Sequence, residues 1–197
     1  MKLPLDFFFF YGSIHTYLSV MRIEKLAAAA GIAVRWRPFN LREILIEQNN
    51  TSFVRNQIRL NYNWRDIERR AERLGVPFTG RPPYPVDAQL LALRVGVVAA
   101  AQGWCADYTK ATFRAWFLEG KVSGLPENVE TILLDLGKPA ADVLARAAAP
   151  QVDERLKQET EAARQLGIFG SPTFAVGQEI FWGDDRLEDA IAFASSA

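Results

Sequence analysis

The residues best placed for chemistry are Ser13 and His15, which follow a short apolar segment near the start of the chain. Ser13 lies between a predicted buried strand and a predicted amphipathic helix, where backbone N–H groups and the positive end of the helix dipole converge. That position favours an anion. From its position alone, however, Ser13 is more simply interpreted as a helix N-cap.

Ser13 and His15 do not form a catalytic pair of the serine hydrolase type. A nucleophilic serine needs a base that a third group orients, and His15 is the single histidine of the sequence. Side chains two residues apart on a helix point to different sides, because only neighbours at i+3 and i+4 share a face. The spacing therefore excludes a Ser–His triad and favours a packing or capping role for His15, with contact to the chemistry as the alternative.

Cysteine and charge counts exclude several classes of protein. The single cysteine, Cys105, excludes an intramolecular disulfide framework, a Cys-rich zinc site and an internal dithiol pair, and it is best interpreted as a small core residue. One histidine excludes a multi-histidine site, so no metal is expected. Since 23 Lys and Arg balance 23 Asp and Glu, we expect no nucleic acid partner.

The apolar runs of the sequence are short. Residues 95–101 form one of the longest, far below the roughly 20 residues that cross a bilayer, so no membrane partner is expected. The N-terminal apolar stretch is interrupted by Asp6 and is followed by no cleavage pattern of small residues. We therefore expect a cytoplasmic protein.

The elements that must position Ser13 form a strand–helix–strand unit. Residues 5–11 are nearly all aromatic, which is typical of a strand buried on both faces. An amphipathic helix is predicted from Ile14 to a stop at Gly31. Residues 32–39 alternate apolar and basic and predict a half-exposed strand. We expect the two strands to be parallel, joined by a right-handed crossover.

The middle of the chain, residues 41–166, predicts helices and no strand. Helices are expected at residues 64–74, 88–102 with Asp87 as a possible N-cap, 108–118, 127–136 and 152–166. Farther on, residues 173–176 and 179–182 flank the turn candidate Gly177-Gln178 and predict an antiparallel hairpin. Asp184 or Asp185 is then expected to cap a last helix.

This α/β order, βαβ, a helical insertion, then ββα, resembles a thioredoxin-like fold interrupted by a helical domain. DsbA-like proteins and kappa-class glutathione transferases have this arrangement. The resemblance implies a discontinuous thioredoxin-like domain, residues 1–40 and 167–197. It also implies a helical insertion domain, residues 41–166, whose last helix leads back into the first.

Three local sequences strengthen the resemblance. Ser13-Ile-His-Thr16 lies where DsbA-like oxidoreductases carry Cys-Pro-His-Cys, and residues 167–174, GIFGSPTF, resemble the loop with a cis-proline, here Pro172. Residues 181–187, FWGDDRL, closely resemble the ending of 2-hydroxychromene-2-carboxylate isomerases. Further matches to that family are Tyr62, Asp66, Arg69 and the turn at residues 75–77. Ile14 and Phe53 depart from the family's usual proline and asparagine.

The resemblance implies that bound glutathione brings the thiol and that Ser13 donates a hydrogen bond to its thiolate. Lowering a thiol pKa from 8.5 to near 7 requires about 2 kcal/mol of preferential stabilisation of the anion. A hydrogen bond to a charged group contributes about 1.5–3 kcal/mol and a helix N-terminus about 0.3–1 kcal/mol. Together they suffice without a basic residue.

The family also implies how glutathione and a substrate are held. The Ser171 backbone, before cis-Pro172, would pair with the cysteinyl backbone of glutathione. Asp184 and Asp185 would meet the γ-glutamyl amino group, with Asp185 favoured.

The substrate pocket is the least specified part of the resemblance. Its candidates are His15, Arg59, Tyr62 and Trp182. The arginines of residues 55–73 are ordinarily a solvated helix face, but one that faces the cleft could hold a substrate carboxylate bidentately.

The implied function is a glutathione-dependent cis-trans isomerase that acts on 2-hydroxychromene-2-carboxylate or a related intermediate of aromatic degradation. Its partners would be glutathione and a small aromatic carboxylate, and a homodimer is possible because related proteins often dimerise. A kappa-like transferase or peroxidase is the first alternative, and a non-catalytic thioredoxin-fold binding module is the second. A dithiol oxidoreductase is disfavoured, because Ser13 stands where disulfide exchange needs a thiolate.

Overall fold

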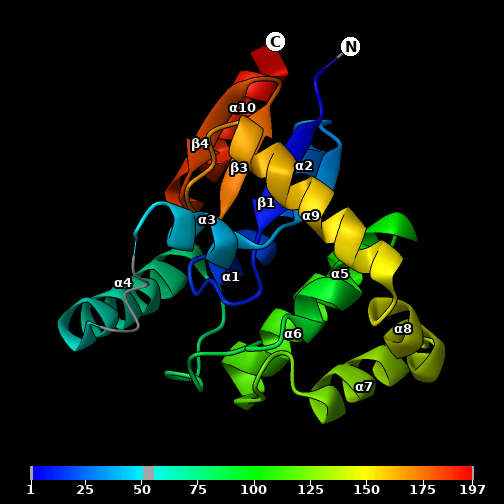
Figure 1. Cartoon of the computed structure of the whole chain (residues 1–197). Helices are drawn as coiled ribbons and strands as arrows, with labels where there is room; N and C mark the ends of the chain where they lie inside the picture. The colour runs from blue at the N-terminus through cyan, green and yellow to red at the C-terminus, as the bar shows by residue number, and fades with distance from the viewer. Residues whose placement is uncertain (1, 51–55, 197) are drawn as a thin grey trace.

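A mixed four-stranded sheet with the order β2-β1-β3-β4 forms the centre of the protein (Figure 1). The structure, a computed structural model, describes residues 2–50 and 56–196. β1 (Leu5–Phe9) pairs in parallel with β2 (Val34–Pro38), and β3 (Thr173–Val176) pairs antiparallel with both β1 and β4 (Glu179–Trp182). The predicted parallel unit and the predicted hairpin are both confirmed.

β1 is buried along its whole length because aromatic side chains cover both of its faces. On one face Phe7 stacks on Phe174 of β3, with ring centroids 5.3 Å apart. On the other face Phe8 packs edge-on against Phe39 at 6.0 Å. Each fully buried Phe contributes roughly 1.5–3 kcal/mol. The strand ends two residues before the predicted limit, and the chain then turns toward Ser13.

The predicted helix after Ser13 is two helices, α1 (Thr16–Val20) and α2 (Ile23–Ala29). Arg22 separates them, with a φ of −121° that lies far from the helical value of about −63°. Its guanidinium donates to the carbonyls of Leu18 and Asp184. The prediction of one continuous helix was therefore wrong, because hydrophobic periodicity continues across a break that side-chain bonds stabilise.

Helices fill the described chain between β2 and β3, as predicted. They are α3 (Leu41–Glu47), α4 (Gln57–Leu74), α5 (Leu91–Ala101), α6 (Cys105–Glu119), α7 (Pro126–Asp135), α8 (Ala140–Ala147) and α9 (Pro150–Gln165). α4 begins earlier than predicted because Asn56 caps it by accepting from the Arg59 N–H. α5 begins at Leu91, later than predicted, and its N-cap is Leu90 instead of Asp87. The Asp87 carboxylate nevertheless accepts from the N–H groups of Ala92 and Leu93 in α5.

Two short helices, α3 and α8, were not predicted. α3 buries only Leu41 and Ile44, and α8 buries mainly small side chains. Neither begins with a side-chain capping bond. A hydrophobic stripe this short, without a cap, gives little signal in a sequence.

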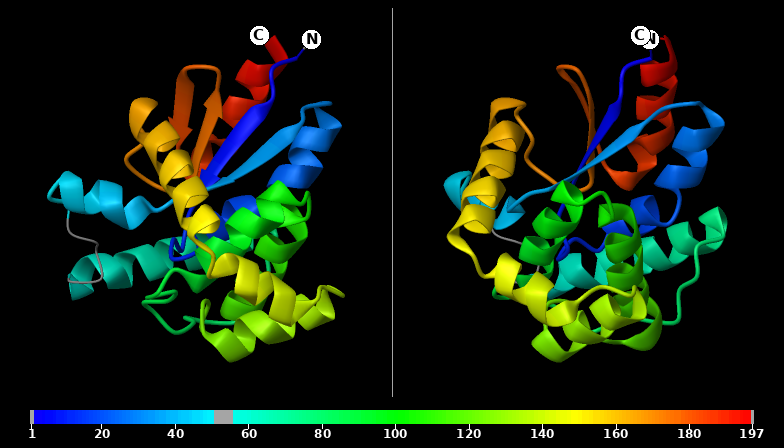
Figure 2. Two further views of the ribbon diagram at one scale, coloured as in Figure 1. Left: turned by 45° about the vertical axis from the view of Figure 1, so that its right-hand side comes forward. Right: turned by 90° about the vertical axis from the view of Figure 1, so that its right-hand side faces the viewer.

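Helices cover both faces of the sheet (Figure 2). α9 lies on one face, whereas α2 and α10 (Leu187–Ser196) lie on the other. The helices α5 to α8 pack together beyond the end of the sheet to which β1 points, far from the two chain termini (Figure 1). We propose that the chain consists of a thioredoxin-like domain, residues 1–40 and 167–197, and a helical insertion domain, residues 41–166.

The basic side chains of β2 form ion pairs with both β1 and α9. Arg35 holds Asp6 of β1 bidentately, with both N···O distances 2.6 Å. Arg37 pairs with the buried Glu159 of α9. The predicted half-exposed character of β2 is thus confirmed.

The last helix is preceded by a 3₁₀ turn, η2 (Asp184–Arg186), that has no side-chain capping bond. Capping by Asp184 or Asp185 was therefore a wrong prediction, and the carboxylate of Asp184 instead binds Arg70. Among the described residues, no helix combines the length and the apolar character needed to cross a membrane.

Candidate functional site

Ser13 lies in the turn between β1 and α1 and is 7% exposed. Its hydroxyl donates to the backbone carbonyl of Ser171 at 2.7 Å, and its N–H donates to the carbonyl of Phe10 at 3.0 Å. α1 begins only at Thr16, with His15 in the N-cap position and no side-chain capping bond. The interpretation of Ser13 as a helix cap is therefore wrong.

The loop before β3 is bonded directly to this turn. The Ser171–Pro172 peptide bond is cis, as the resemblance implied. The Ser171 hydroxyl accepts from the Phe10 N–H at 3.0 Å and shares a hydrogen bond of 2.8 Å with the hydroxyl of Thr16. These bonds close a ring between the turn and the loop, so the carbonyl that faces Ser13 has a fixed position. These roles of Thr16 and the Ser171 side chain were not predicted.

Asp184 and Asp185 differ in environment although they are neighbours. Asp184 is buried, and its Oδ2 accepts from both Nε (2.9 Å) and Nη2 (2.5 Å) of Arg70. Burial raises the pKa of Asp184, and the Arg70 ion pair opposes that rise. Asp185 is exposed and, among the described residues, forms an ion pair with Arg186 alone. Asp185 is thus the carboxylate that a ligand can reach, while Asp184 is engaged in anchoring α4 to η2.

His15 lies beside the same group of charges. Its Nε2 is 4.0 Å from Oδ2 of Asp66 on α4. Burial lowers the pKa of His15 from its ordinary value of 6.5, although the carboxylates of Asp184 and Asp66 oppose this shift. The imidazole is therefore mainly neutral at pH 7. It lies two residues from Ser13 but forms no hydrogen bond with it in the described structure.

Comparison with known proteins assigns the chain to a family. A model of the DsbA-like thioredoxin domain matches residues 4–192 of the chain. The chain belongs to this DsbA-like family. The predicted α/β fold, a thioredoxin-like sheet with a helical insertion, is confirmed.

Within the DsbA-like family, the chain is similar to enzymes named 2-hydroxychromene-2-carboxylate isomerase. The Pseudomonas putida protein is 27% identical over 186 residues, which cover 93% of this chain and 90% of that protein. The Sphingobium xenophagum protein is 28% identical over 197 residues, covering 95% and 96%. A solved structure of a 2-hydroxychromene-2-carboxylate isomerase superposes with a TM-score of 0.86 at 27% identity, covering 97% and 95% of the two chains. The resemblance that the sequence motifs indicated is confirmed.

Three of the predicted pocket residues of this DsbA-like chain are exposed. Tyr62 is 65% exposed, Arg59 is also exposed, and both lie in the N-terminal half of α4. Trp182, 52% exposed, contacts the ring of Phe169 at 4.7 Å and covers Gly170, two residues before Pro172. The structure thus brings Trp182 to the cis-proline loop and adds Phe169, but it leaves Tyr62 and Arg59 on the surface.

Cys105 is a core residue, as predicted. It is buried in α6, and its Sγ lies 3.5 Å from the carbonyl of Gly96. Burial raises the pKa of the Cys105 thiol to about 12, so the thiol stays protonated at neutral pH and is a poor nucleophile. In the described part of the chain, no group of three or more His, Cys, Asp or Glu side chains could hold a metal.

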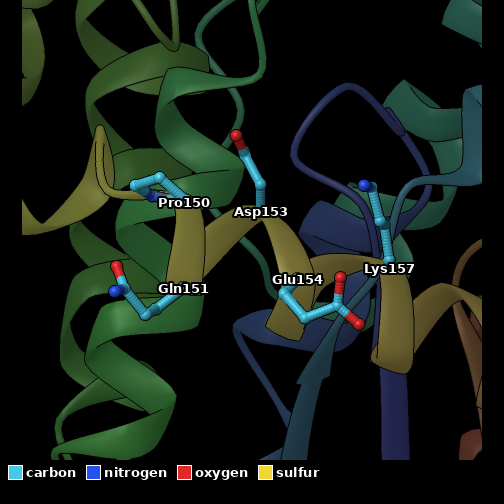
Figure 3. Close-up of a pocket in the computed structure, with 5 residues that line it drawn as sticks. All are labelled: Pro150, Gln151, Asp153, Glu154 and Lys157. Carbon is cyan, nitrogen blue, oxygen red and sulfur yellow. The ribbon is translucent and has the colours of Figure 1, made fainter.

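A surface hollow of about 460 Å³ lies elsewhere, at the start of α9 (Figure 3). It is lined by Pro150, Gln151, Asp153, Glu154 and Lys157. These side chains come from one helix and include no aromatic ring. The hollow therefore does not suit an aromatic substrate.

Proposed function

We propose that this protein is a glutathione-dependent cis-trans isomerase of 2-hydroxychromene-2-carboxylate or a related intermediate of aromatic degradation. The supporting observation is the Ser13 hydroxyl, which is held opposite the cis-proline loop in a chain without cysteine at this position. The similarity to two enzymes named as isomerases of this compound supports the reaction class. The sole cysteine is buried and protonated, so the reactive thiol must come from a ligand.

The residues at the site fit glutathione. The Ser171 carbonyl, which accepts from Ser13 in this structure, can accept the cysteinyl N–H of a ligand once the Ser13 hydroxyl turns to the sulfur. The exposed carboxylate of Asp185 can accept from the γ-glutamyl ammonium group. Asp184 is less suited than predicted, because Arg70 already occupies its Oδ2.

Glutathione would supply a thiolate that adds reversibly to the unsaturated carbon of the substrate, so that rotation about a single bond becomes possible before elimination. The Ser13 hydroxyl would donate a hydrogen bond to the sulfur and so stabilise the thiolate. Such a bond contributes about 1.5–3 kcal/mol, which covers the roughly 2 kcal/mol needed to bring a thiol pKa near 7. The chain needs no redox partner, because the thiol is regenerated.

A kappa-like glutathione transferase or peroxidase would use the same thiolate, but it would consume glutathione in each turnover. The test is therefore conversion of 2-hydroxychromene-2-carboxylate with glutathione at a tenth of the substrate concentration. We expect complete conversion with the glutathione recovered unchanged. Stoichiometric loss of glutathione would favour the transferase.

A non-catalytic binding module is the second alternative. It predicts no turnover and no difference between the wild-type protein and Ser13→Ala in glutathione binding, which calorimetry measures. That result would overturn both enzymatic functions. A cytoplasmic location agrees with the proposal, because the cytosol keeps a pool of reduced glutathione.

A further inference from the structure

Arg42, in the first turn of α3, is a half-buried arginine without a carboxylate partner among the described residues. The other half-buried arginines of the described chain each have one: Arg22–Glu188, Arg37–Glu159, Arg70–Asp184, Arg94–Asp153 and Arg164–Glu47. Arg42 instead donates from Nη1 to the carbonyls of Asp87 (2.8 Å) and Ala88 (3.1 Å), and from Nη2 to that of Val86 (2.8 Å). The guanidinium is thus fixed in place while its charge lacks an ion pair.

The three carbonyl bonds leave two N–H donors of the Arg42 guanidinium without a partner in the described structure, and together these two donors form a free fork. A guanidinium carries five N–H groups, so Nε–H and one Nη2–H remain. This is the pair of donors with which Arg35 holds Asp6 and Arg164 holds Glu47. Nε of Arg42 has no hydrogen-bond partner among the described residues. The free fork matches a carboxylate in shape and charge.

Arg42 lies at the same end of the sheet as Ser13. β1 and β2 are parallel, so the segments that follow them, with Ser13 and Arg42, both begin at the carboxyl ends of the strands. This is the end of the sheet at which α/β proteins bind ligands. The guanidinium lies 5.1 Å from the ring centroid of Phe10. That ring also covers Gly12, where a Cβ atom would come within 2.6 Å of it. Phe10 therefore connects Arg42 to the turn that carries Ser13.

The other candidates for binding a carboxylate are less suitable. Arg70 is engaged by Asp184, and Arg69 lies 3.5 Å from Asp66. Arg59 is exposed on α4, where water screens its charge. Asp87 uses its carboxylate to cap α5, and Arg42 acts on it only through space, where its charge opposes the rise in the Asp87 pKa. Arg42 therefore forms no ion pair with a carboxylate of the described chain and can form one with an anion from outside it.

We propose that Arg42 binds the carboxylate of the substrate through Nε and Nη2, and that it, rather than Arg59, determines the specificity for a carboxylate. The inference rests on the proposed function, because that function supplies the carboxylate substrate. The bonds to residues 86–88 and the Phe10 ring hold the fork in position beside the Ser13 turn.

The test compares two ligands of similar size and shape, benzylidenepyruvate and its primary amide, which lacks the negative charge. Calorimetry without glutathione measures their affinities for the wild-type protein, Arg42→Gln, Arg42→Lys and the matched control Arg146→Gln. Arg146 is exposed on α8 and forms no ion pair in the described structure. A bidentate arginine gives a preference for the carboxylate of about 10- to 100-fold. We expect this preference in the wild-type protein and the control, part of it in Arg42→Lys, and none in Arg42→Gln.

Several outcomes would overturn the inference. They are a wild-type protein without the preference, a preference that persists in Arg42→Gln, and an equal loss of affinity for both ligands, which would indicate a structural role. Failure of the proposed function is distinguishable, because it appears as absent turnover of 2-hydroxychromene-2-carboxylate with glutathione, whereas the comparison of the two ligands needs no turnover.

Discussion

The Ser13 hydroxyl donates to the Ser171 carbonyl at 2.7 Å, across the contact between the β1–α1 turn and the cis-proline loop. A hydroxyl has a single proton to donate, so Ser13 cannot serve this carbonyl and a thiolate at the same time. Binding of a thiolate must therefore turn the proton toward sulfur and leave the carbonyl to an N–H of the ligand. The resting bond of Ser13 thus makes the site selective for thiols that carry an amide.

This exchange predicts that two small thiols bind with different affinities. N-acetylcysteine has an amide N–H next to its thiol-bearing carbon chain, whereas 3-mercaptopropionate has none. One neutral hydrogen bond contributes about 0.5–1.5 kcal/mol, so N-acetylcysteine should bind roughly 2- to 12-fold more tightly. Competition against glutathione measures both affinities. Equal affinities would show that the Ser171 carbonyl does not recognise the ligand.

The Ser171 side chain is predicted to stabilise the loop as well as its carbonyl. In Ser171→Ala the buried Phe10 N–H loses its acceptor, which should cost about 1–3 kcal/mol of unfolding free energy and weaken glutathione binding. Thr16→Val removes only one partner of the hydroxyl pair and should have a smaller effect. Urea unfolding and glutathione titration test this, with the exposed Ser196→Ala as the control. An unfolding free energy of Ser171→Ala equal to that of Ser196→Ala would contradict the prediction.

The ion pair of Arg70 with Asp184 should be important for stability because both groups are withdrawn from water. Arg70→Met leaves the buried carboxylate without its partner, and loss of one partner of such a pair costs about 3–5 kcal/mol. Arg73→Met, three residues farther along α4 on its exposed face, should change the unfolding free energy by less than about 0.5 kcal/mol. Urea unfolding at pH 7 distinguishes the two variants. Similar losses in both would mean that Asp184 is not held by Arg70.

Asp87 should make stability depend on pH. Burial raises the pKa of Asp87 from 3.8 to about 6, so the folded protein keeps a proton there that the unfolded chain has released. The folded state then binds more protons between these two values, and its stability falls as pH rises from about 4 to 6, by roughly 3 kcal/mol.

The variant Asp87→Asn should flatten this part of the profile, because an amide does not titrate. Asp142→Asn is the matched control, since Asp142 lies near a helix N-terminus, as Asp87 does, but is exposed. Unfolding free energies measured at pH 4 and pH 6.5 compare the three proteins. A slope in Asp87→Asn equal to that of the wild-type protein would rule out Asp87 as its source.

Sequence alone identified the parts of the fold that local patterns determine. The aromatic run of β1, the hairpin around Gly177 and the helix stop at Gly75 each have a physical signature within a few residues. The cis-proline at Pro172 could be expected only from the family resemblance. The break at Arg22 had no such signature, because it depends on bonds to a carbonyl at Asp184, far along the chain.

For the candidate site too, local motifs could be predicted and contacts between distant segments could not. Ser13 and Pro172 could be identified from motifs, but the Arg70–Asp184 pair joins residues 114 positions apart, and no pattern in either segment predicts it. Asp184 was therefore retained as a candidate ligand for glutathione beside the favoured Asp185. Arg42 was overlooked because its role depends on three carbonyls of residues 86–88, which tertiary structure alone brings to it.

The measurement that tests the central hypothesis most directly is the pKa of glutathione bound to the protein, read from the ultraviolet absorbance of its thiolate as pH is varied. In the wild-type protein we expect a bound thiol pKa near 7. In Ser13→Ala it should rise by about 1–2 units, because a hydrogen bond to an anion contributes about 1.5–3 kcal/mol. A thiol pKa that is the same in both proteins would contradict the role of Ser13 in stabilising the thiolate.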